Sequence, residues 1–313
     1  MAAFRNIRLV APYSYTHRIR VKAGESAQSV VRYLRVRFPH IPEKEWYHRI
    51  SEGHLQLERR GKIQADAKLF EEELQVSDVL LHHVPFMVEP SVPDEVQIID
   101  DKPGFLAVFK PAPLPMHSGG RYHKNTLISI LHGMGYGDLK IVHRLDAVTS
   151  GLVVLAKNKE YARLLTEAFQ QQHVQKTYWA LVHALPVDEH IHRIHVPVKR
   201  KKGFVFECAP EQKDALDAVT LVQYLPQGSE SLPMNSFLVE CRPLTGRTHQ
   251  IRLHLDWWGH PICNDPIYGP QGDRSGKRIQ NTGIALLSKE LSIPTLNYTC
   301  AISDSMALNT LLQ

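Results

Sequence analysis

The pattern of apolar and polar positions in the first eighty residues predicts two helices and short strands. Apolar residues recur at helical spacing between residues 26 and 38, and Ser26 stands where it could cap that helix. The apolar face of this helix comprises Ala27, Val30, Val31, Leu34 and Phe38. A second helix is predicted over residues 43–51, with Gly53 placed to end it. Residues 54–58 and 79–84 read as strands, the first because its apolar side chains alternate with polar ones.

A second, larger domain is predicted after residue 84. Pro85, Pro90 and Pro93 mark residues 85–95 as a linker between a module at residues 1–84 and a domain at residues 96–313. In the second domain, helices are predicted over residues 159–172 and 249–258, and strands over residues 96–99, 105–109, 178–182, 218–224 and 236–241. Because most strands follow one another without a helix between them, we expect an α+β domain with a largely antiparallel mixed sheet and flanking helices.

The composition is typical of a globular protein and does not identify the molecule that the protein binds. The 313 residues are 43% hydrophobic and 22% charged, and no apolar run approaches the roughly 20 residues of a membrane span. The amino terminus lacks the pattern of a secretory signal, so we expect a cytoplasmic protein without a membrane partner. The net charge of +5 permits nucleic-acid binding without requiring it. Local basic clusters, each of which could equally be a solvated face, comprise Arg32, Arg35 and Arg37; Arg59, Arg60 and Lys62; and Lys199, Arg200, Lys201 and Lys202.

Cysteines and histidines give little reason to expect a metal. The four cysteines are widely spaced and form no Cys-x-x-Cys pair, so we interpret them as reduced structural residues. His190, His192 and His195 lie close together in the chain, and His249 and His254 fall near one predicted helix. Neither group is accompanied by a zinc motif, and we predict no metal site.

Asp146 is the acidic residue whose setting points most clearly to chemistry. It lies in a short polar turn that runs directly into the apolar segment from Leu152 to Ala156. A connection held by a rigid strand is a suitable place to present a reactive carboxylate. Taken alone, however, an aspartate in a polar turn is more often a cap or an Asx-turn residue.

Several ordered motifs resemble those of the RluA family of RNA pseudouridine synthases, from about Val96 to Pro294. The turn itself, His143-Arg144-Leu145-Asp146, resembles the catalytic motif of that family. Similar segments are Lys110-Pro111 through His117, Lys176-Thr177-Tyr178-Trp179-Ala180, the stretch from Gly246-Arg247-Thr248-His249-Gln250-Ile251-Arg252 to His254, and Gly259 to Gly269. This chain has Pro113 and Asn264 where the family usually has glycine, and Ala285-Leu286-Leu287-Ser288 lacks a common histidine.

The resemblance implies three catalytic residues and a reaction without a cofactor. Asp146 would attack or stabilise the ribose anomeric carbon, or remove a ribose proton to give a glycal, and the sequence leaves both routes open. Arg252 would pair with Asp146 and keep the carboxylate ionised in a partly dry pocket. Tyr178 would pack on the uracil, and its hydroxyl could accept the proton of carbon five, although a phenol is a weak base.

Other residues in these motifs are predicted to hold RNA. Arg144 would fill the gap left by a uridine that is flipped out of its helix. His143, Lys110, Arg247, His249 and Thr149 complete the predicted RNA-binding set. Thr149, Ser150 and Gly151 would also shape the turn, because hydroxyls can satisfy exposed backbone groups and glycine permits close approach.

The first domain resembles the αL RNA-binding module of a ribosomal protein, over about Ile19 to Val84. That likeness implies a small α/β module that binds RNA, although Glu58-Arg59-Arg60-Gly61-Lys62 replaces the usual Asn-Gly turn. A packing domain without RNA contact remains an alternative.

Together these features predict a monomeric synthase that isomerises uridines in structured RNA. Ribosomal RNA is favoured by analogy and transfer RNA is possible. The alternatives are an RNA-binding or RNA-chaperone protein without activity, and a hydrolase that would release free base.

Overall fold

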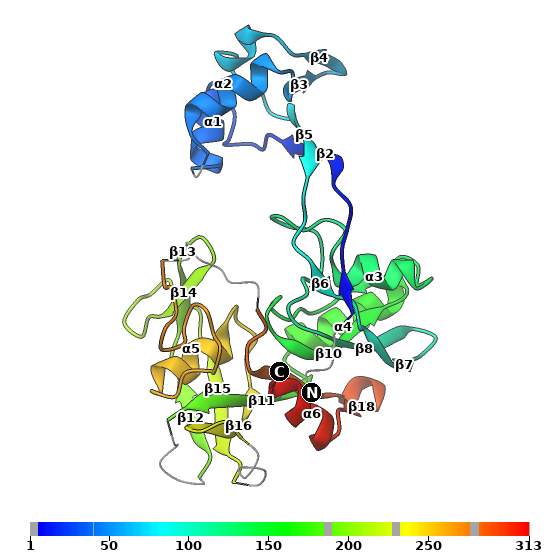
Figure 1. The fold of residues 1–313 in the computed structure, drawn as a ribbon, viewed down its shortest axis with the longest axis vertical. Helices are drawn as coiled ribbons and strands as arrows, with labels where there is room; N and C mark the ends of the chain where they lie inside the picture. Colours follow the sequence, from blue (N-terminus) through cyan, green and yellow to red (C-terminus); the bar gives the residue numbers. More distant parts are fainter. Residues whose placement is uncertain (1–5, 40, 185–189, 227–231, 276–281, 313) are drawn as a thin grey trace. The chain divides into compact units, whose positions relative to one another are not determined.

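The chain forms two compact units. The computed structural model describes residues 6–39, 41–184, 190–226, 232–275 and 282–312. One unit is Val10–Glu89; the other begins at Pro90 and includes strand β1 (Ile7–Arg8), which pairs antiparallel with β6 (Val92–Pro93) (Figure 1). These limits differ from the predicted ones, because β5 (Val79–Met87) continues through Pro85 and stays paired as far as Met87.

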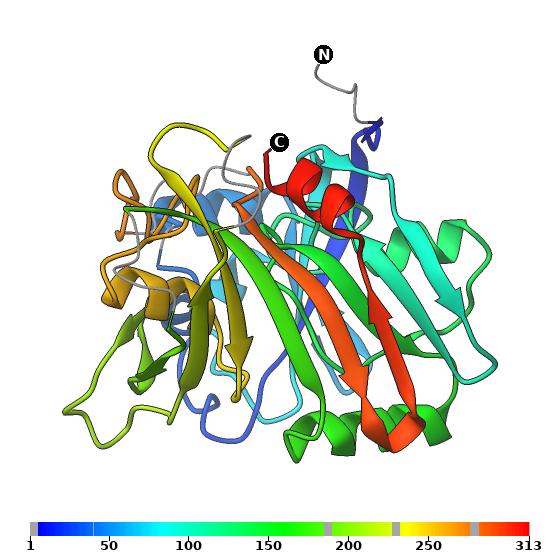
Figure 2. The same cartoon turned by 90° about the horizontal axis from the view of Figure 1, so that it is seen from below.

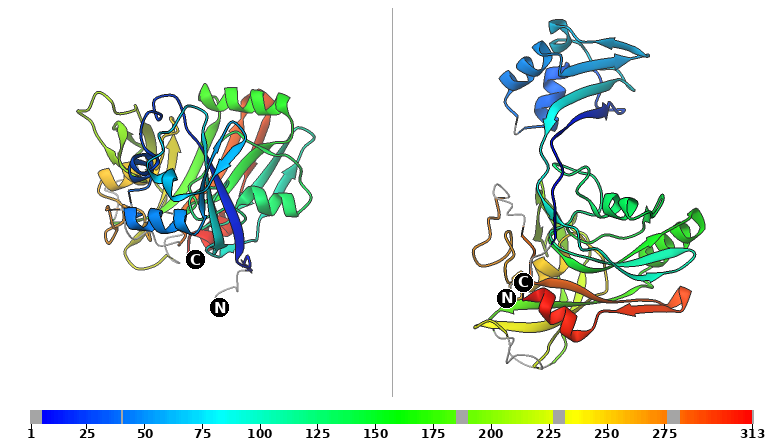
Figure 3. Two further views of the ribbon diagram at one scale, coloured as in Figure 1. Left: turned by 90° about the horizontal axis from the view of Figure 1, so that it is seen from above. Right: turned by 45° about the vertical axis from the view of Figure 1, so that its right-hand side comes forward.

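Two helices cover one face of a four-stranded sheet in the Val10–Glu89 unit (Figure 3, right). The helices are α1 (Val30–Arg37) and α2 (Glu43–Ser51), followed later by the 3-10 helix η1 (Ala67–Phe70). The sheet has the order β2 (Tyr13–Arg20), β5, β3 (Leu55–Arg59) and β4 (Lys62–Gln64). Trp46 and Leu34 are fully buried in a core of their own, so this unit holds a separate hydrophobic core.

The first helix begins later than the sequence predicts. Ser29, not Ser26, is its N-cap, and its hydroxyl accepts a hydrogen bond from the Arg32 N–H at 3.4 Å. Ala27 has a φ of 59° and donates its N–H to the Leu74 carbonyl, while Gln28 accepts the Leu74 N–H. The backbone before Ser29 is therefore paired with a distant segment, and these non-local bonds replace the predicted first turn.

The altered turn sequence between β3 and β4 keeps the geometry of a two-residue hairpin. Arg59 pairs with Lys62, and the φ angles of Arg60 and Gly61 are 49° and 76°. Positive φ at both positions is typical of a type I′ turn, in which asparagine is favoured first. Arg60 therefore stands at the turn position that favours asparagine.

Several arginines of the predicted basic clusters are already paired with carboxylates. Arg59 binds the buried carboxylate of Asp78 at 2.7 Å and Glu72 at 2.5 Å. Arg35 and Arg37 lie 3.4 Å from Glu43 and Glu25. The clusters thus serve partly to hold the unit together, while Arg32, Arg60 and Lys62 are exposed.

A ten-stranded sheet forms the centre of the larger unit and confirms the predicted fold class. Figure 2 shows β16, β11, β17 and β18 side by side, in yellow, green, orange and red. β18 pairs with β17, and β9 pairs with β10, beside the main path. All neighbouring pairs are antiparallel except β10 and β17. The main path runs β12 (His192–His195), β15 (Val219–Tyr224), β16 (Ser236–Pro243), β11 (Gln175–His183), β17 (Leu286–Ile293), β10 (Ser150–Ala156), β8 (Phe105–Lys110) and β7 (Gln97–Asp101); the side strands are β9 (Lys140–Ile141) and β18 (Tyr298–Ala301).

Helices and a small hairpin surround this sheet. α4 (Lys159–Gln170) packs against β10, α5 (Gln250–Trp257) against β15 and β16, and α6 (Asp304–Leu311) against β17 and β11. A hairpin of β13 (Val198–Lys202) and β14 (Val205–Cys208) contacts α5. The described residues also form α3 (Leu127–Gly133) and the 3-10 helix η3 (Pro294–Leu296).

β17 lies between two strands that come much earlier in the chain. Gly151 of β10 and Tyr178 of β11 both have Ser288 of β17 as their register partner. Gly151 has a φ of 116°, and a Cβ at this position would lie 2.4 Å from the Ser288 carbonyl oxygen. The predicted close approach at Gly151 is confirmed, because only a residue without a side chain allows these backbones to meet.

We expect Gly151→Ala to lower the free energy of unfolding by about 3 kcal/mol, since it adds both backbone strain and a steric overlap. Chemical denaturation of the two proteins measures this loss. The control is Gly137→Ala, where the added methyl group meets no atom within 4 Å. Equal losses at the two positions would contradict the role given to Gly151.

Candidate active site

A cavity of about 500 Å³ brings the predicted site residues together. Its volume lies in the range of small-molecule sites. Every predicted catalytic or RNA-binding residue lines it except Lys110: His143, Arg144, Asp146, Thr149, Tyr178, Arg247, His249 and Arg252. Residues from the turn before β10, from β11 and from α5 therefore meet at one place, although they are far apart in the sequence.

Asp146 is held in a tight turn before β10. The Thr149 N–H donates to the Asp146 carbonyl at 3.1 Å, and the Leu114 N–H donates to the Ala147 carbonyl at 2.8 Å. The Asp146 side chain is 23% exposed, so its carboxylate reaches the cavity while its backbone is fixed.

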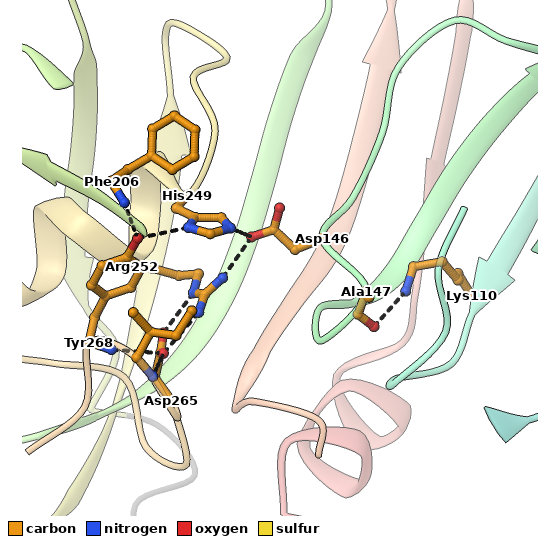
Figure 4. Close-up of polar contacts among 9 residues, drawn as sticks. Lys110, Asp146, Ala147, Phe206, His249, Arg252, Asp265 and Tyr268 are labelled. Atoms are coloured by element: carbon orange, nitrogen blue, oxygen red, sulfur yellow. Dashed lines mark hydrogen bonds and ion pairs between the residues drawn. The ribbon is translucent and has the colours of Figure 1, made fainter. Parts of the chain in front are cut away.

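Lys110 donates hydrogen bonds to the backbone of this turn and of the neighbouring loop. The prediction that it contacts RNA is wrong, because its side chain is fully buried at the end of β8. Its ammonium donates to the carbonyls of Leu114 and Pro111 at 2.9 and 3.2 Å. It also donates to the Ala147 carbonyl at 3.3 Å (Figure 4). Burial lowers the pKa of Lys110 to about 7, and the charge of Asp146 counters that effect. Three carbonyl acceptors match the three N–H donors of an ammonium group.

Arg252 is fixed by one carboxylate and aimed at another. Its Nε and Nη2 donate to the two oxygens of Asp265 at 2.7 and 2.9 Å, while Nη1 donates to Asp146 Oδ2 at 3.0 Å. Asp265 also accepts the backbone N–H groups of Ile267 and Tyr268 at 2.9 and 3.0 Å. This bidentate anchor leaves the guanidinium little freedom, so Arg252 presents a fixed charge to Asp146.

The balance of charges keeps Asp146 ionised. Burial raises the pKa of its carboxyl group, but His249 and Arg252 together bring the pKa below its ordinary value. Burial in turn lowers the pKa of His249, which leaves that ring mostly neutral near pH 7. Arg252, whose guanidinium stays charged, is therefore the lasting counter-charge.

Tyr178 lines the cavity from β11, with a side chain that is almost fully buried. Burial raises the pKa of its hydroxyl to about 12. The phenol is therefore neutral at physiological pH, which favours packing against a base over proton removal.

His143 has a structural role that the sequence did not indicate. The Val154 N–H donates to His143 Nε2 at 2.9 Å, and the ring stacks on Phe169 with a centroid separation of 4.3 Å. Burial lowers the pKa of His143 to about 3, so the ring is neutral. Thr149 is buried in the cavity wall, which leaves little surface for RNA. Arg144 is exposed beside the cavity, and its contact with RNA stays a prediction, as does that of Arg247.

Sequence reasoning missed the polar residues that hold the site together. Gln250 accepts from Thr245 Oγ1 and the Arg247 N–H, and donates to the Val219 carbonyl. His254 is fully buried and bonds Thr220 and the Val196 carbonyl. Asp265 and Tyr268 were seen only as parts of a motif, because their partners lie elsewhere in the sequence.

Comparison with known proteins identifies the class of this chain. The family model described as RNA pseudouridylate synthase matches residues 104–257. An RNA pseudouridine synthase homologue of Mycoplasma pneumoniae is 32% identical over 227 residues, which cover 71% of this chain and 70% of the relative. The chain belongs to the RNA pseudouridine synthases, and within them to the RluA family.

Other relatives are named for two kinds of RNA. The mitochondrial tRNA pseudouridine(32) synthase of Saccharomyces cerevisiae is 30% identical, and the match covers 84% of this chain and 55% of the yeast protein. Ribosomal large subunit pseudouridine synthase C of Rickettsia bellii is 35% identical, and the match covers 55% of this chain and 56% of the relative. A solved human structure, RNA Pseudouridylate Synthase Domain Containing 1, is 25% identical with a TM-score of 0.55 and covers 69% of this chain and 86% of that one. The chain spans about half to two thirds of the length of the human and plant synthases that it matches.

We expect Arg252→Met to lower the free energy of unfolding by about 3–5 kcal/mol at pH 7, because the buried carboxylate of Asp265 and the partly buried one of Asp146 lose their partner. In the native protein the pKa values of Asp146 and Asp265 are lowered against the effect of burial, so the stability they add is present above about pH 4 and is lost as pH falls through their folded pKa values. In the variant, burial raises those pKa values, and protonation relieves the unpaired charge.

The stability gap between wild type and Arg252→Met should therefore narrow when pH falls from 7 to about 4. Urea denaturation at both pH values measures the gap. Arg274→Met serves as control, since its ion pair with Asp256 is largely exposed on the arginine side. A gap that stays constant with pH would refute the assigned charge balance.

Proposed function

We propose that this protein is an RNA pseudouridine synthase that isomerises uridines in structured RNA and uses Asp146 as its catalytic carboxylate. The observation that carries this proposal is the pairing of Asp146 with Arg252 at 3.0 Å inside the cavity. Membership of the RluA family and the names of the relatives support the same activity.

Among the described residues, only one oxygen of Asp146 has a polar partner. Arg252 and His249 both face Oδ2, and Oδ1 accepts no hydrogen bond from the part of the chain that the structure describes. Figure 4 shows Oδ1 directed away from both partners. A carboxylate held at one oxygen and open at the other is suited to approach an electron-poor ribose carbon.

The proposed reaction breaks one bond to the ribose and forms another. The bond between the uracil nitrogen and the ribose breaks, the base turns, and a new bond forms from carbon five to the same ribose carbon. The proton on carbon five then leaves and the released uracil nitrogen takes up a proton, so the product is an isomer and no redox step occurs. Asp146 would act as nucleophile or remove a ribose proton, and both routes remain part of the proposal.

Tyr178 and Arg144 would manage the base. Tyr178 would stack on the uracil, because its neutral ring forms part of the cavity wall. Arg144 would occupy the gap in the RNA stack, since the target atoms are accessible only in a flipped-out nucleotide. Ribosomal RNA is our first substrate class and transfer RNA the second, and relatives carry both in their names.

The described residues include no helix that is long and apolar enough to cross a membrane. A cytoplasmic location and a monomeric state remain predictions.

The activity is tested with RNA that carries tritium at carbon five of uridine. We expect the wild type to release tritium into water and leave pseudouridine in the chain. Asp146→Asn should lower the release on the order of 10³-fold or more while RNA affinity stays within about tenfold. Asp138→Asn, at a carboxylate that is 92% exposed, is the matched control and should keep full activity.

Two other outcomes would replace the proposal. Binding of ribosomal and transfer RNA without tritium release would indicate an RNA-binding protein without activity. Release of free uracil would indicate a hydrolase.

We further propose that the Val10–Glu89 unit binds the RNA phosphate backbone, as its likeness to αL modules implies. Reversing two exposed charges, with Arg60→Glu and Lys62→Glu, should weaken RNA binding about tenfold and reduce its salt dependence. The rate at saturating RNA should change little, because Asp146 lies in the other unit. The control reverses Lys102 and Lys140 of the larger unit, and equal losses in both variants would refute a specific role for the smaller unit.

A further inference from the structure

The ring of His249 is held between two aromatic rings at the edge of the site. His249 caps α5 with a φ of 58° and a ψ of 17°, a left-handed conformation that is uncommon outside glycine. Phe206 and Tyr268 approach the ring at 67° and 69°, with centroid separations of 5.3 and 5.6 Å. Such backbone strain persists only where surrounding contacts determine the position.

The hydrogen bonds of Tyr268 determine which nitrogen of His249 carries the proton. The Phe206 N–H, on strand β14, donates to Tyr268 Oη at 3.0 Å. His249 Nδ1 lies 2.8 Å from the same oxygen (Figure 4). If Nδ1 also donated to Tyr268, the phenol hydrogen would lack a partner among the described residues. The satisfied arrangement has Tyr268 donating to Nδ1, which places the hydrogen of the neutral ring on Nε2.

The protonated nitrogen then faces the catalytic carboxylate. His249 Nε2 lies 3.7 Å from Asp146 Oδ2, the oxygen that Arg252 also contacts. This separation exceeds that of a hydrogen bond, and catalytic contacts commonly shorten when substrate closes a site. The His249 side chain is 12% exposed, so water competes weakly for this N–H.

We propose that His249 is a positioning residue that donates its Nε2 hydrogen to Asp146, and that Tyr268, held by the backbone of the β13–β14 hairpin, fixes the required tautomer. Arg252 and His249 would together confine Oδ2 and leave Oδ1 to the substrate. This role replaces the RNA contact predicted for His249. It rests on the proposed function in so far as Asp146 is the catalytic group.

The tautomer can be measured in the free protein by ¹⁵N NMR of labelled histidine, with His249→Gln used to assign the signal. At neutral pH we expect wild-type Nε2 to carry the hydrogen and Nδ1 to act as acceptor. In Tyr268→Phe, which keeps the ring and loses only the hydroxyl, this preference should disappear. A hydrogen on Nδ1 in the wild type, or the same tautomer in both proteins, would overturn the proposal.

Tritium release under single-turnover conditions provides the kinetic test. Tyr268→Phe should lower the rate about tenfold with unchanged RNA affinity, whereas Tyr224→Phe on β15 should match the wild type. His249→Gln, whose amide can supply an N–H near the Nε2 position, should exceed His249→Leu by about tenfold or more. Equal rates for Gln and Leu would show that only packing matters. A wild type that releases no tritium would refute the proposed function instead, and the NMR experiment would still test the tautomer.

Discussion

The site depends on one buried charge arrangement, in which Arg252 is bound by Asp265 and directed at Asp146. Each member needs the others, because an unpaired carboxylate or guanidinium at this depth would be strongly unfavourable. Asp265 is held by two backbone N–H groups as well as by Arg252, so it forms the fixed end of the arrangement. Asp146 is the end whose partly exposed side chain reaches the cavity.

The surrounding structure serves mainly to keep these groups in register. Lys110 and Leu114 hold the turn that carries Asp146, and Gln250 and His254 tie the start and middle of α5 to β15. Most of these contacts are hydrogen bonds between buried groups, which are costly to leave unpaired and so favour a single geometry. A rigid scaffold of this kind can hold a carboxylate and an aromatic ring at fixed positions in the cavity wall.

Much of the fold could be predicted from the sequence because its strands and helices have clear periodicities. The helix at residues 43–51 and the strands around Phe105 and Tyr178 lie where the apolar pattern places them. The start of α1 was misjudged because the backbone near Ala27 pairs with Leu74, which no local pattern reveals. Motif similarity brought Asp146, Tyr178 and Arg252 together, yet it assigned Lys110 to RNA, since a sequence does not tell whether a lysine faces solvent or three carbonyl oxygens.

The position of β17 has a consequence for how the protein is made. Asp146 lies in the turn before β10, and Tyr178 lies on β11. These two strands are not neighbours in the sheet, because β17 lies between them, and its Ser288 separates Gly151 from Tyr178. A nascent chain that has emerged only as far as α5 holds Asp146, Tyr178 and Arg252 but lacks the strand that sets their spacing. During synthesis on the ribosome, the observed arrangement of these three residues can form only after residues 286–293 have joined the sheet.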